Sequence, residues 1–130
     1  MQEQEIEVKI QRLVPWASLP EYDTKGAAGC DLAVALQEEQ VLYPQEITSF
    51  STGIALKIPL GYEAQIRSRA GMAKKGIIVA NAPATIDSAH VEEIKILLLN
   101  TTNKPIRIIP QQKVAQLVFA PVVKAVLAES

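Results

Sequence analysis

The sequence predicts an all-β fold, an antiparallel sandwich or jelly roll, on three observations. Many short apolar or alternating segments follow one another and are separated by turn residues. The chain has eight prolines, several of which stand at the ends of these segments. Only residues 70–75 have the character of a helical turn, which is too short to change the fold class. Together these features are typical of a sandwich or jelly roll.

The first strands are predicted from alternation and from turn residues. Within residues 5–13, Ile6, Val8 and Ile10 alternate with polar side chains, which predicts a half-buried strand over 5–13. Residues 15–25 carry two prolines and polar turn residues, so we expect an extended loop. The small residues at 26–29 let backbones approach closely before a strand over 31–36. Residues 40–43 predict a short strand that ends at a proline.

The later strands follow the same logic, with glycines at the changes of direction. Residues 46–59 alternate around Gly53, where a bulge or a change of sheet is expected. Gly61 makes the turn into an alternating strand over 62–67. The remaining predicted strands are 77–80, 93–100, 106–109 and 113–123.

Two of these strands are nearly continuous apolar runs. The apolar runs at residues 94–99 and 114–118 are typical of strands that are covered on both faces. A homo-oligomer whose subunits pack sheet against sheet would cover them. A deep strand in a sandwich core would look similar, so the pattern leaves both explanations open.

Length and composition limit the classes to which the protein can belong. We expect residues 1–130 to form a single domain. A net charge of −1 does not provide the positive charge that non-specific nucleic-acid binding requires. One cysteine, Cys30, excludes an intramolecular disulfide and is expected to be a small buried residue. The acidic, alternating amino terminus does not resemble a signal peptide, and no apolar run is long enough to span a membrane. We therefore expect a soluble, cytoplasmic protein without membrane or nucleic-acid partners.

The stretch 65–93 carries the chemistry that the sequence suggests. Four cationic side chains lie between 67 and 75, around Gly71 and before Gly76, and a single carboxylate, Asp87, follows an apolar run. Cations and free backbone N–H groups in such a loop suit a nucleotide phosphate chain, and a carboxylate beyond it can act as a general base for water. A solvated turn, with Asp87 bonded to nearby backbone, is the alternative interpretation.

Four segments, taken in order, resemble the motifs of the trimeric dUTP diphosphatases (dUTPases). This family consists of jelly-roll enzymes that hydrolyse dUTP to dUMP and diphosphate. The likeness covers nearly the whole chain, and four motifs in order are a specific signal for fold and ancestry. The matching segments are 26–32, 67–76, 81–88 with 93–95, and 110–117.

The resemblance implies roles for residues that would handle the phosphates. Asp87 aligns with the carboxylate that orients or deprotonates the water attacking the α-phosphorus. Arg69, in the same motif as Gly71, and Gln116 align with residues near the phosphates, and Arg69 is implied to share in catalysis. Asp31 aligns with a carboxylate that supports a Mg²⁺ ion through its water shell, the ion being held mainly by the triphosphate. Read alone, Asp31 is equally a buried structural carboxylate.

The resemblance also implies how the base is bound and how subunits combine. Asn81 stands where the family begins the hairpin that takes uracil, largely by main-chain hydrogen bonds. The family's site is assembled from more than one subunit of a homotrimer. A deoxycytidine nucleotide deaminase of the same fold is a weaker alternative, because Thr85, Ile86 and Asp87 favour the diphosphatase branch.

The chain departs from the family pattern at several of these positions. Ala70 replaces a serine that gives a hydrogen bond to the phosphates, and His90 replaces a tyrosine that excludes a ribose 2′-hydroxyl. Ala84, Ala89 and Glu92 also depart from the third motif. In the fourth motif Gln111 stands for Gly and Lys113 for Arg.

These departures predict impaired activity and suggest a second function. No glycine follows Gly76, so we expect the glycine-rich lid motif of the family to be absent. The alternative is a non-catalytic trimeric scaffold, natural or engineered. In that hypothesis an 84–92 hairpin forms a protein–protein interface, either with further copies or with a second protein component.

Overall fold

The computed structural model describes residues 4–130 and is built almost entirely of β-strands. In these residues the single helix, α1 (Ala70–Lys74), has five residues, and no described helix is long and apolar enough to cross a membrane. The strands are β1 (Lys9–Arg12), β2 (Glu21–Tyr22), β3 (Gly29–Ala33), β4 (Gln40–Leu42), β5 (Ile47–Ser51), β6 (Ile54–Lys57), β7 (Tyr62–Ser68), β8 (Ile77–Val79), β9 (Ala84–Ile86), β10 (Lys95–Asn100), β11 (Ile106–Ile108) and β12 (Lys113–Pro121).

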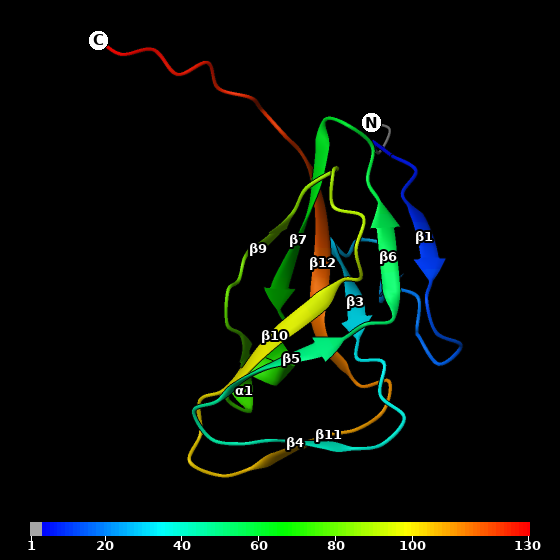
Figure 1. Ribbon diagram of the computed structural model, residues 1–130, viewed down its shortest axis with the longest axis vertical. Coiled ribbons are helices and arrows are strands. Elements are labelled where there is room, and N and C mark those ends of the chain that lie inside the picture. Colours follow the sequence, from blue (N-terminus) through cyan, green and yellow to red (C-terminus); the bar gives the residue numbers. More distant parts are fainter. Residues whose placement is uncertain (1–3) are drawn as a thin grey trace.

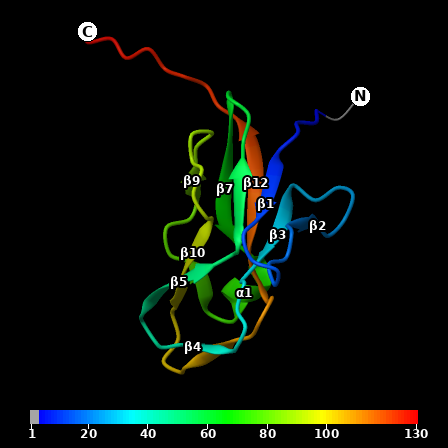
Figure 2. The ribbon, with the colours of Figure 1, turned by 45° about the vertical axis from the view of Figure 1, so that its right-hand side comes forward.

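The strands form four sheets of a jelly roll, and every strand pair in them is antiparallel. The largest sheet has the order β2-β3-β12-β7-β9, and Figure 1 shows β3, β12 and β7 running together along the molecule. A second sheet has the order β5-β10-β8, and its strands β5 and β10 run at an angle to the first sheet in Figures 1 and 2. The pairs β1-β6 and β11-β4 complete the strand pairing. The predicted all-β jelly roll is therefore confirmed.

The core lies between these sheets and is filled by alternate residues of the strands. Phe50 of β5, Ile96 and Leu98 of β10, and Leu117 of β12 are all essentially inaccessible to solvent. In β10 the intervening residues 97 and 99 are only half-buried. The continuous apolar run therefore has one face in the core and a second face that this chain covers in part.

Gly53 marks the change of sheet that its place in the sequence predicted. It separates β5, which pairs with β10, from β6, which pairs with β1. Its φ of 69° lies in the left-handed region, where glycine is unstrained. The chain thus leaves one sheet and enters another across only two residues, Thr52 and Gly53.

Three predicted elements differ from the structure. β1 covers only Lys9–Arg12 of the expected strand 5–13, and its side chains are exposed and not half-buried. The expected loop 15–25 contains β2, which has two residues and therefore no readable alternation. The segment 84–92 is not a hairpin: β9 pairs with β7, and an irregular loop follows it.

Gln111 clamps the turn that precedes β12. Its φ is 58°, in the left-handed region, although it is not glycine. Its side-chain amide donates to the carbonyls of Trp16, at 3.0 Å, and Leu36, at 3.2 Å. The turn is thereby tied to two loops that are far away in the sequence.

We expect Gln111→Ala to lower the free energy of unfolding by about 1–2 kcal/mol, because two hydrogen bonds are lost while the left-handed backbone is kept. Gln111→Gly loses the same bonds but relieves the backbone, so its loss should be about 1 kcal/mol smaller. Urea denaturation of the two variants measures the difference. Equal losses would mean that the backbone at this position is not strained.

Candidate active site

A row of polar side chains crosses four strands of the largest sheet. Strand register places Glu21 opposite Asp31, Asp31 opposite Gln116, and Gln116 opposite Arg67. Residues directly opposite one another point to the same face of a sheet, so these four side chains share a face. The opposite face carries Cys30, Leu117 and Ile66, which are buried in the core.

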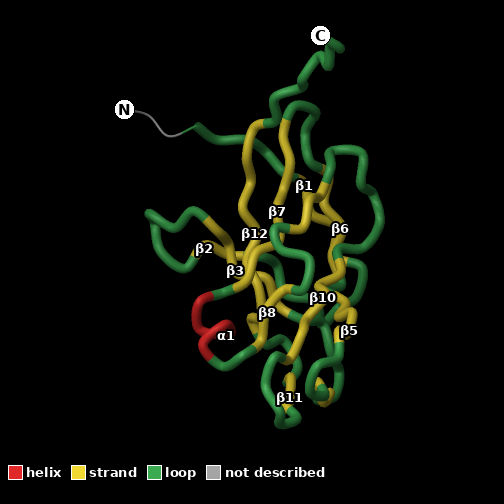
Figure 3. The backbone as a smooth tube through the Cα atoms, turned by 90° about the vertical axis from the view of Figure 1, so that its left-hand side faces the viewer, coloured by secondary structure: helices red, strands yellow, loops and turns green. Residues whose placement is uncertain are grey.

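Asp31 and Arg69 form the shortest ion pair among residues 4–130. Nε of Arg69 lies 3.0 Å from Oδ1 of Asp31, and Nη1 of Arg69 donates to the carbonyl of Lys113 at 2.8 Å. Nζ of Lys113 lies 3.7 Å from Oδ2 of Asp31. Arg69 immediately precedes α1, which Figure 3 shows in red beside the end of β3. The three residues thus meet where β3, β12 and α1 converge.

Gln116 lies across the middle of the sheet. Its side-chain nitrogen donates to the carbonyl of Ser68 on β7 at 3.2 Å. Its side-chain oxygen lies over Gly29 on β3, so close that a Cβ at position 29 would be 2.5 Å from it. Glycine at 29 therefore provides the space that lets Gln116 lie flat on the sheet.

Gly29→Ala is expected to displace the Gln116 side chain and to cost about 1–2 kcal/mol of unfolding free energy through overpacking and the lost hydrogen bond. Gly26→Ala is the matched control, because a Cβ there meets no atom within 4 Å. The side-chain amide signals of Gln116 in an NMR spectrum should shift in the first variant only. Unmoved Gln116 signals in Gly29→Ala would contradict the packing described here.

Asp87 and His90 lie at the other end of β7. Asp87 follows Ile86, which pairs with Ala64 near the start of β7, whereas Arg69 follows the last residue of that strand. At about 3.3 Å per residue, the two ends of β7 are roughly 20 Å apart. Figure 1 agrees, since the loop after β9 lies towards the top and α1 towards the bottom. One chain therefore does not bring Asp87 together with Arg69.

The surroundings of Asp87 are open. Its side chain is exposed, and its carbonyl accepts a hydrogen bond from the backbone N–H of His90 at 3.0 Å, which closes a turn. Nδ1 of His90 lies 3.4 Å from Oε2 of Glu92. Within residues 4–130 no ion pair or hydrogen bond involves the Asp87 carboxylate. The carboxylate is thus available to a water molecule or a ligand.

Asn81 and Gly71 complete the residues that the motifs predicted. Asn81 is exposed in the turn between β8 and β9, on the side of the molecule where β9 begins. Gly71 lies within α1, where an added Cβ would meet no atom within 4 Å. Sterics within this chain therefore do not require glycine at position 71.

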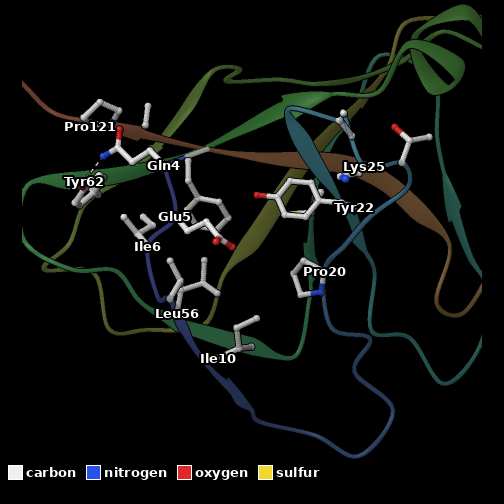
Figure 4. Close-up of a pocket in the computed structure, with 17 residues that line it drawn as sticks. Gln4, Glu5, Ile6, Ile10, Pro20, Tyr22, Lys25, Leu56, Tyr62 and Pro121 are labelled. Carbon is white, nitrogen blue, oxygen red and sulfur yellow. Dashed lines mark hydrogen bonds between the residues drawn. The ribbon is translucent and has the colours of Figure 1, made fainter. Parts of the chain in front are cut away.

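Two hollows flank the sheet, and the larger one is not at the polar row. A groove of about 710 Å³ has a mainly apolar lining that includes Ile6, Leu56 and Phe119, on the face of β3 that carries Cys30. Figure 4 shows Tyr22 and Lys25 at its side. A smaller hollow of about 360 Å³ is lined by Asp31 and Lys113. We assign the site by its charged groups, which lie at the smaller hollow.

Cys30 is buried and free, as its isolation in the sequence predicted. Burial raises the pKa of its thiol, and burial also raises the pKa of the neighbouring Tyr22 phenol. The thiolate, which is the nucleophile and metal ligand, is therefore disfavoured at neutral pH. Cys30 belongs to the core and not to the chemistry of the site.

The donor groups of this chain do not form a metal cage. Among residues 4–130 no three His, Cys, Asp or Glu side chains gather where they could hold an ion. Both Asp31 oxygens face cationic side chains. Mg²⁺ usually keeps several waters and binds substrate phosphates with one or two carboxylates. The residues present therefore fit a Mg²⁺ ion carried by a phosphate chain and not one held by the protein alone.

Sequence reasoning did not predict where three residues lie at the candidate site. The contacts of Lys113 with Asp31 and Arg69, and the place of Glu21 opposite Asp31, depend on strand register. The sequence predicted that Gly29 permits close approach of backbones. It did not predict that the Gln116 side chain packs directly on Gly29. Alternation could have placed Asp31 and Gln116 on inner or outer faces, but it does not tell which strands are neighbours.

Solved structures of the same fold define the class of protein. A mutant form of the dUTPase from phage phi11 of S. aureus matches with a TM-score of 0.87 over 96% of this chain and 97% of that chain, at 24% identity. The dUTPase of Staphylococcus bacteriophage 80alpha matches with a TM-score of 0.84 over 95% and 96% of the two chains, at 25% identity. The fold is thus a jelly roll of the dUTPase type.

Sequence comparison is more specific than the fold. The dUTPase family profile matches residues 16–130. The deoxyuridine 5′-triphosphate nucleotidohydrolase of Orientia tsutsugamushi is 43% identical over 119 residues, which cover 88% of this chain and 80% of that protein. The enzyme of the same name from Nautilia profundicola is 45% identical over 125 residues, 95% of this chain and 87% of that protein. The chain belongs to the dUTPase family.

Proposed function

We propose that this protein hydrolyses dUTP to dUMP and diphosphate, with Mg²⁺, at a site shared between the subunits of a homotrimer. Membership in the dUTPase family supports the reaction. The observation that carries the shared site is the separation of its two halves. Asp31, Arg69 and Gln116 gather at one end of β7, whereas Asp87 lies at the other end, roughly 20 Å away.

An oligomer would join these two halves. If the end of β9 in one subunit faces the Arg69 end of β7 in the next, Asp87 meets the phosphate-binding groups of its neighbour. The exposed apolar side chains beyond β12 favour association, since Val123, Val126 and Leu127 are each more than nine-tenths exposed. Figure 1 shows this segment leaving the body of the chain. A ring of three copies closes such a head-to-tail contact.

The proposed roles follow from the groups present. Arg69 and Gln116 would bind and orient the phosphate chain, because a guanidinium and an amide donate to phosphate oxygens. Asp87, exposed and without a competing cation in residues 4–130, would orient or deprotonate the attacking water. Asn81 and His90, which both belong to the third motif region, would bind the nucleoside. Bound Mg²⁺ would offset negative charge on the phosphates, with Asp31 as its nearest carboxylate through water.

The test is diphosphate release from dUTP in the presence of Mg²⁺, compared with dTTP, dCTP and UTP, on protein of measured mass in solution. Selective dUTP turnover by a trimer is the expected result. Equal turnover of dUTP and UTP would mean that His90 does not exclude a ribose. A monomer with full activity would contradict the shared site.

A non-catalytic assembly protein is the second candidate. Val91, three-quarters exposed, lies in the loop after β9 and gives that loop an apolar surface. A well-folded trimer that leaves dUTP intact, and that associates further or binds a second protein through residues 84–92, would favour this function. Low but selective turnover would instead support the predicted impairment from Ala70 and the altered third motif.

A further inference from the structure

Asp31 lies between two cations, one at each carboxylate oxygen. Arg69 approaches Oδ1 at 3.0 Å and Lys113 approaches Oδ2 at 3.7 Å. The Asp31 side chain is 13% exposed, so it has lost most of its contact with water. A carboxylate in this position needs opposite charge beside it, and both neighbours supply it.

Arg69 is held at two points of its guanidinium group. Nε contacts Asp31 on β3, and Nη1 donates to the backbone carbonyl of Lys113 at the start of β12. Because the guanidinium is planar and rigid, two attachments fix the orientation of its plane. The side chain is still 34% exposed, and its other N–H groups make no hydrogen bond within residues 4–130. Those N–H groups are therefore available to a ligand, on a guanidinium that is already held at two points.

We infer that Asp31 is a positioning residue for Arg69, and that Lys113 completes the arrangement, so that the guanidinium is oriented for a phosphate chain before the ligand arrives. An arginine loses much rotamer freedom when it binds, and a side chain that is already held avoids that loss. The inference rests on the proposed function only in taking the ligand to be a phosphate chain.

Lys113 holds both partners at once. Its carbonyl accepts from Arg69 while its ammonium group approaches Asp31. It begins β12 at an irregularity in the pairing with β3, between residues 113 and 115, so its backbone does not follow the regular ladder. This local irregularity brings the carbonyl and the ammonium group of one residue to the same cluster.

Asp31→Asn distinguishes positioning from other roles by the sign of its effect. An asparagine cannot satisfy two cationic donors, because one of its two atoms is an NH₂ group. Positioning predicts that a phosphate chain binds more weakly to the variant, with or without Mg²⁺. Charge alone predicts tighter binding, because a negative group is removed near an anion. Support of a metal ion predicts weaker binding only when Mg²⁺ is present.

The experiment measures binding of inorganic tripolyphosphate by calorimetry, with Mg²⁺ and with a chelator. We expect Asp31→Asn to weaken binding about five- to tenfold in both conditions. Glu39→Gln is the matched control, because it removes one carboxylate from an exposed pair with Arg107 at 3.9 Å and changes the net charge equally. Affinity in the control should stay within about twofold of the parent protein.

A second measurement follows Arg69 itself. The Arg69 Nε–H signal in an NMR spectrum should exchange slowly with water in the parent protein and rapidly in Asp31→Asn. The Arg107 Nε–H signal should exchange rapidly in both. Asp31→Glu restores the negative charge and should recover most of the affinity and of the slow exchange. This readout remains valid if Asp31→Asn is less stable, provided that it stays folded at the temperature used.

The outcomes separate this inference from the proposed function. Unchanged or tighter tripolyphosphate binding by Asp31→Asn, weakening only with Mg²⁺, or a parent protein that does not bind tripolyphosphate would each overturn the positioning role. Absence of dUTP turnover together with weaker binding in both conditions would remove the proposed reaction and leave the positioning role intact.

Discussion

Asp87→Asn is expected to lower dUTP turnover by at least about 100-fold, the usual contribution of a general base. The asparagine keeps the shape of the side chain but cannot take a proton from water. Because Asp87 is exposed and outside every ion pair of residues 4–130, its replacement should not change the trimer or its unfolding midpoint. Steady-state diphosphate release, with light scattering as the control for assembly, measures both. Unchanged turnover would remove Asp87 from the mechanism.

The same variant tests whether the site is shared between subunits. Asp87→Asn retains Arg69, and Arg69→Ala retains Asp87, so a mixed trimer of the two contains one intact site. When equal amounts of the two variants are unfolded and refolded together, three quarters of random trimers are mixed, and about one quarter of the turnover of the unsubstituted protein should return. No recovery from two inactive parents that do form mixed trimers would show that each site lies within one subunit.

Gly53→Ala is expected to lower the free energy of unfolding by about 3 kcal/mol, the largest effect on stability among the substitutions considered. The left-handed backbone, with φ of 69°, accounts for about 1 kcal/mol. An added Cβ would also lie 2.6 Å from Cγ2 of Val14 and 2.8 Å from Cβ of Ala17, and overpacking of this kind costs about 1–3 kcal/mol.

Gly61→Ala is the control that isolates the backbone contribution. Its φ is 92°, and an added Cβ meets no atom within 4 Å. Its loss should therefore be about 1 kcal/mol, without the overpacking cost. Urea denaturation of the two variants gives the comparison. Equal losses would mean that the loop around Ala17 moves aside at little cost.

Sequence alone predicted the elements whose pattern is long enough to read. The alternation around β7 and the glycine between β5 and β6 gave the correct strands and the correct change of sheet. β2 and β9 were missed because their sequences, Glu21–Tyr22 and Ala84–Ile86, carry no run of apolar residues, and they are strands because they pair with the edges of β3 and β7. Local pattern therefore fails where tertiary pairing alone makes the strand.

The candidate site was predictable as a set of residues but not as a geometry. The motifs identified Asp31, Arg69 and Gln116, and the structure brings these three to one end of the sheet. The distance between Arg69 and Asp87 depends on the register of β9 against β7, which no local pattern contains. Lys113 lies beside Asp31 and Arg69 because the pairing of β12 with β3 is irregular between residues 113 and 115. The sequence pattern does not predict this irregularity either.

The central place of β12 has a consequence for how the chain acquires its structure during synthesis. β12 lies between β3 and β7, yet it follows both in sequence, and Cys30 contacts Leu117 across a separation of 87 residues. The middle of the sheet therefore stays open on the ribosome until β12 emerges. Contacts of such long range make folding slow, on the order of milliseconds to seconds. Asp31, Arg69 and Gln116 should consequently meet in the last step of folding, together with the sheet that holds them.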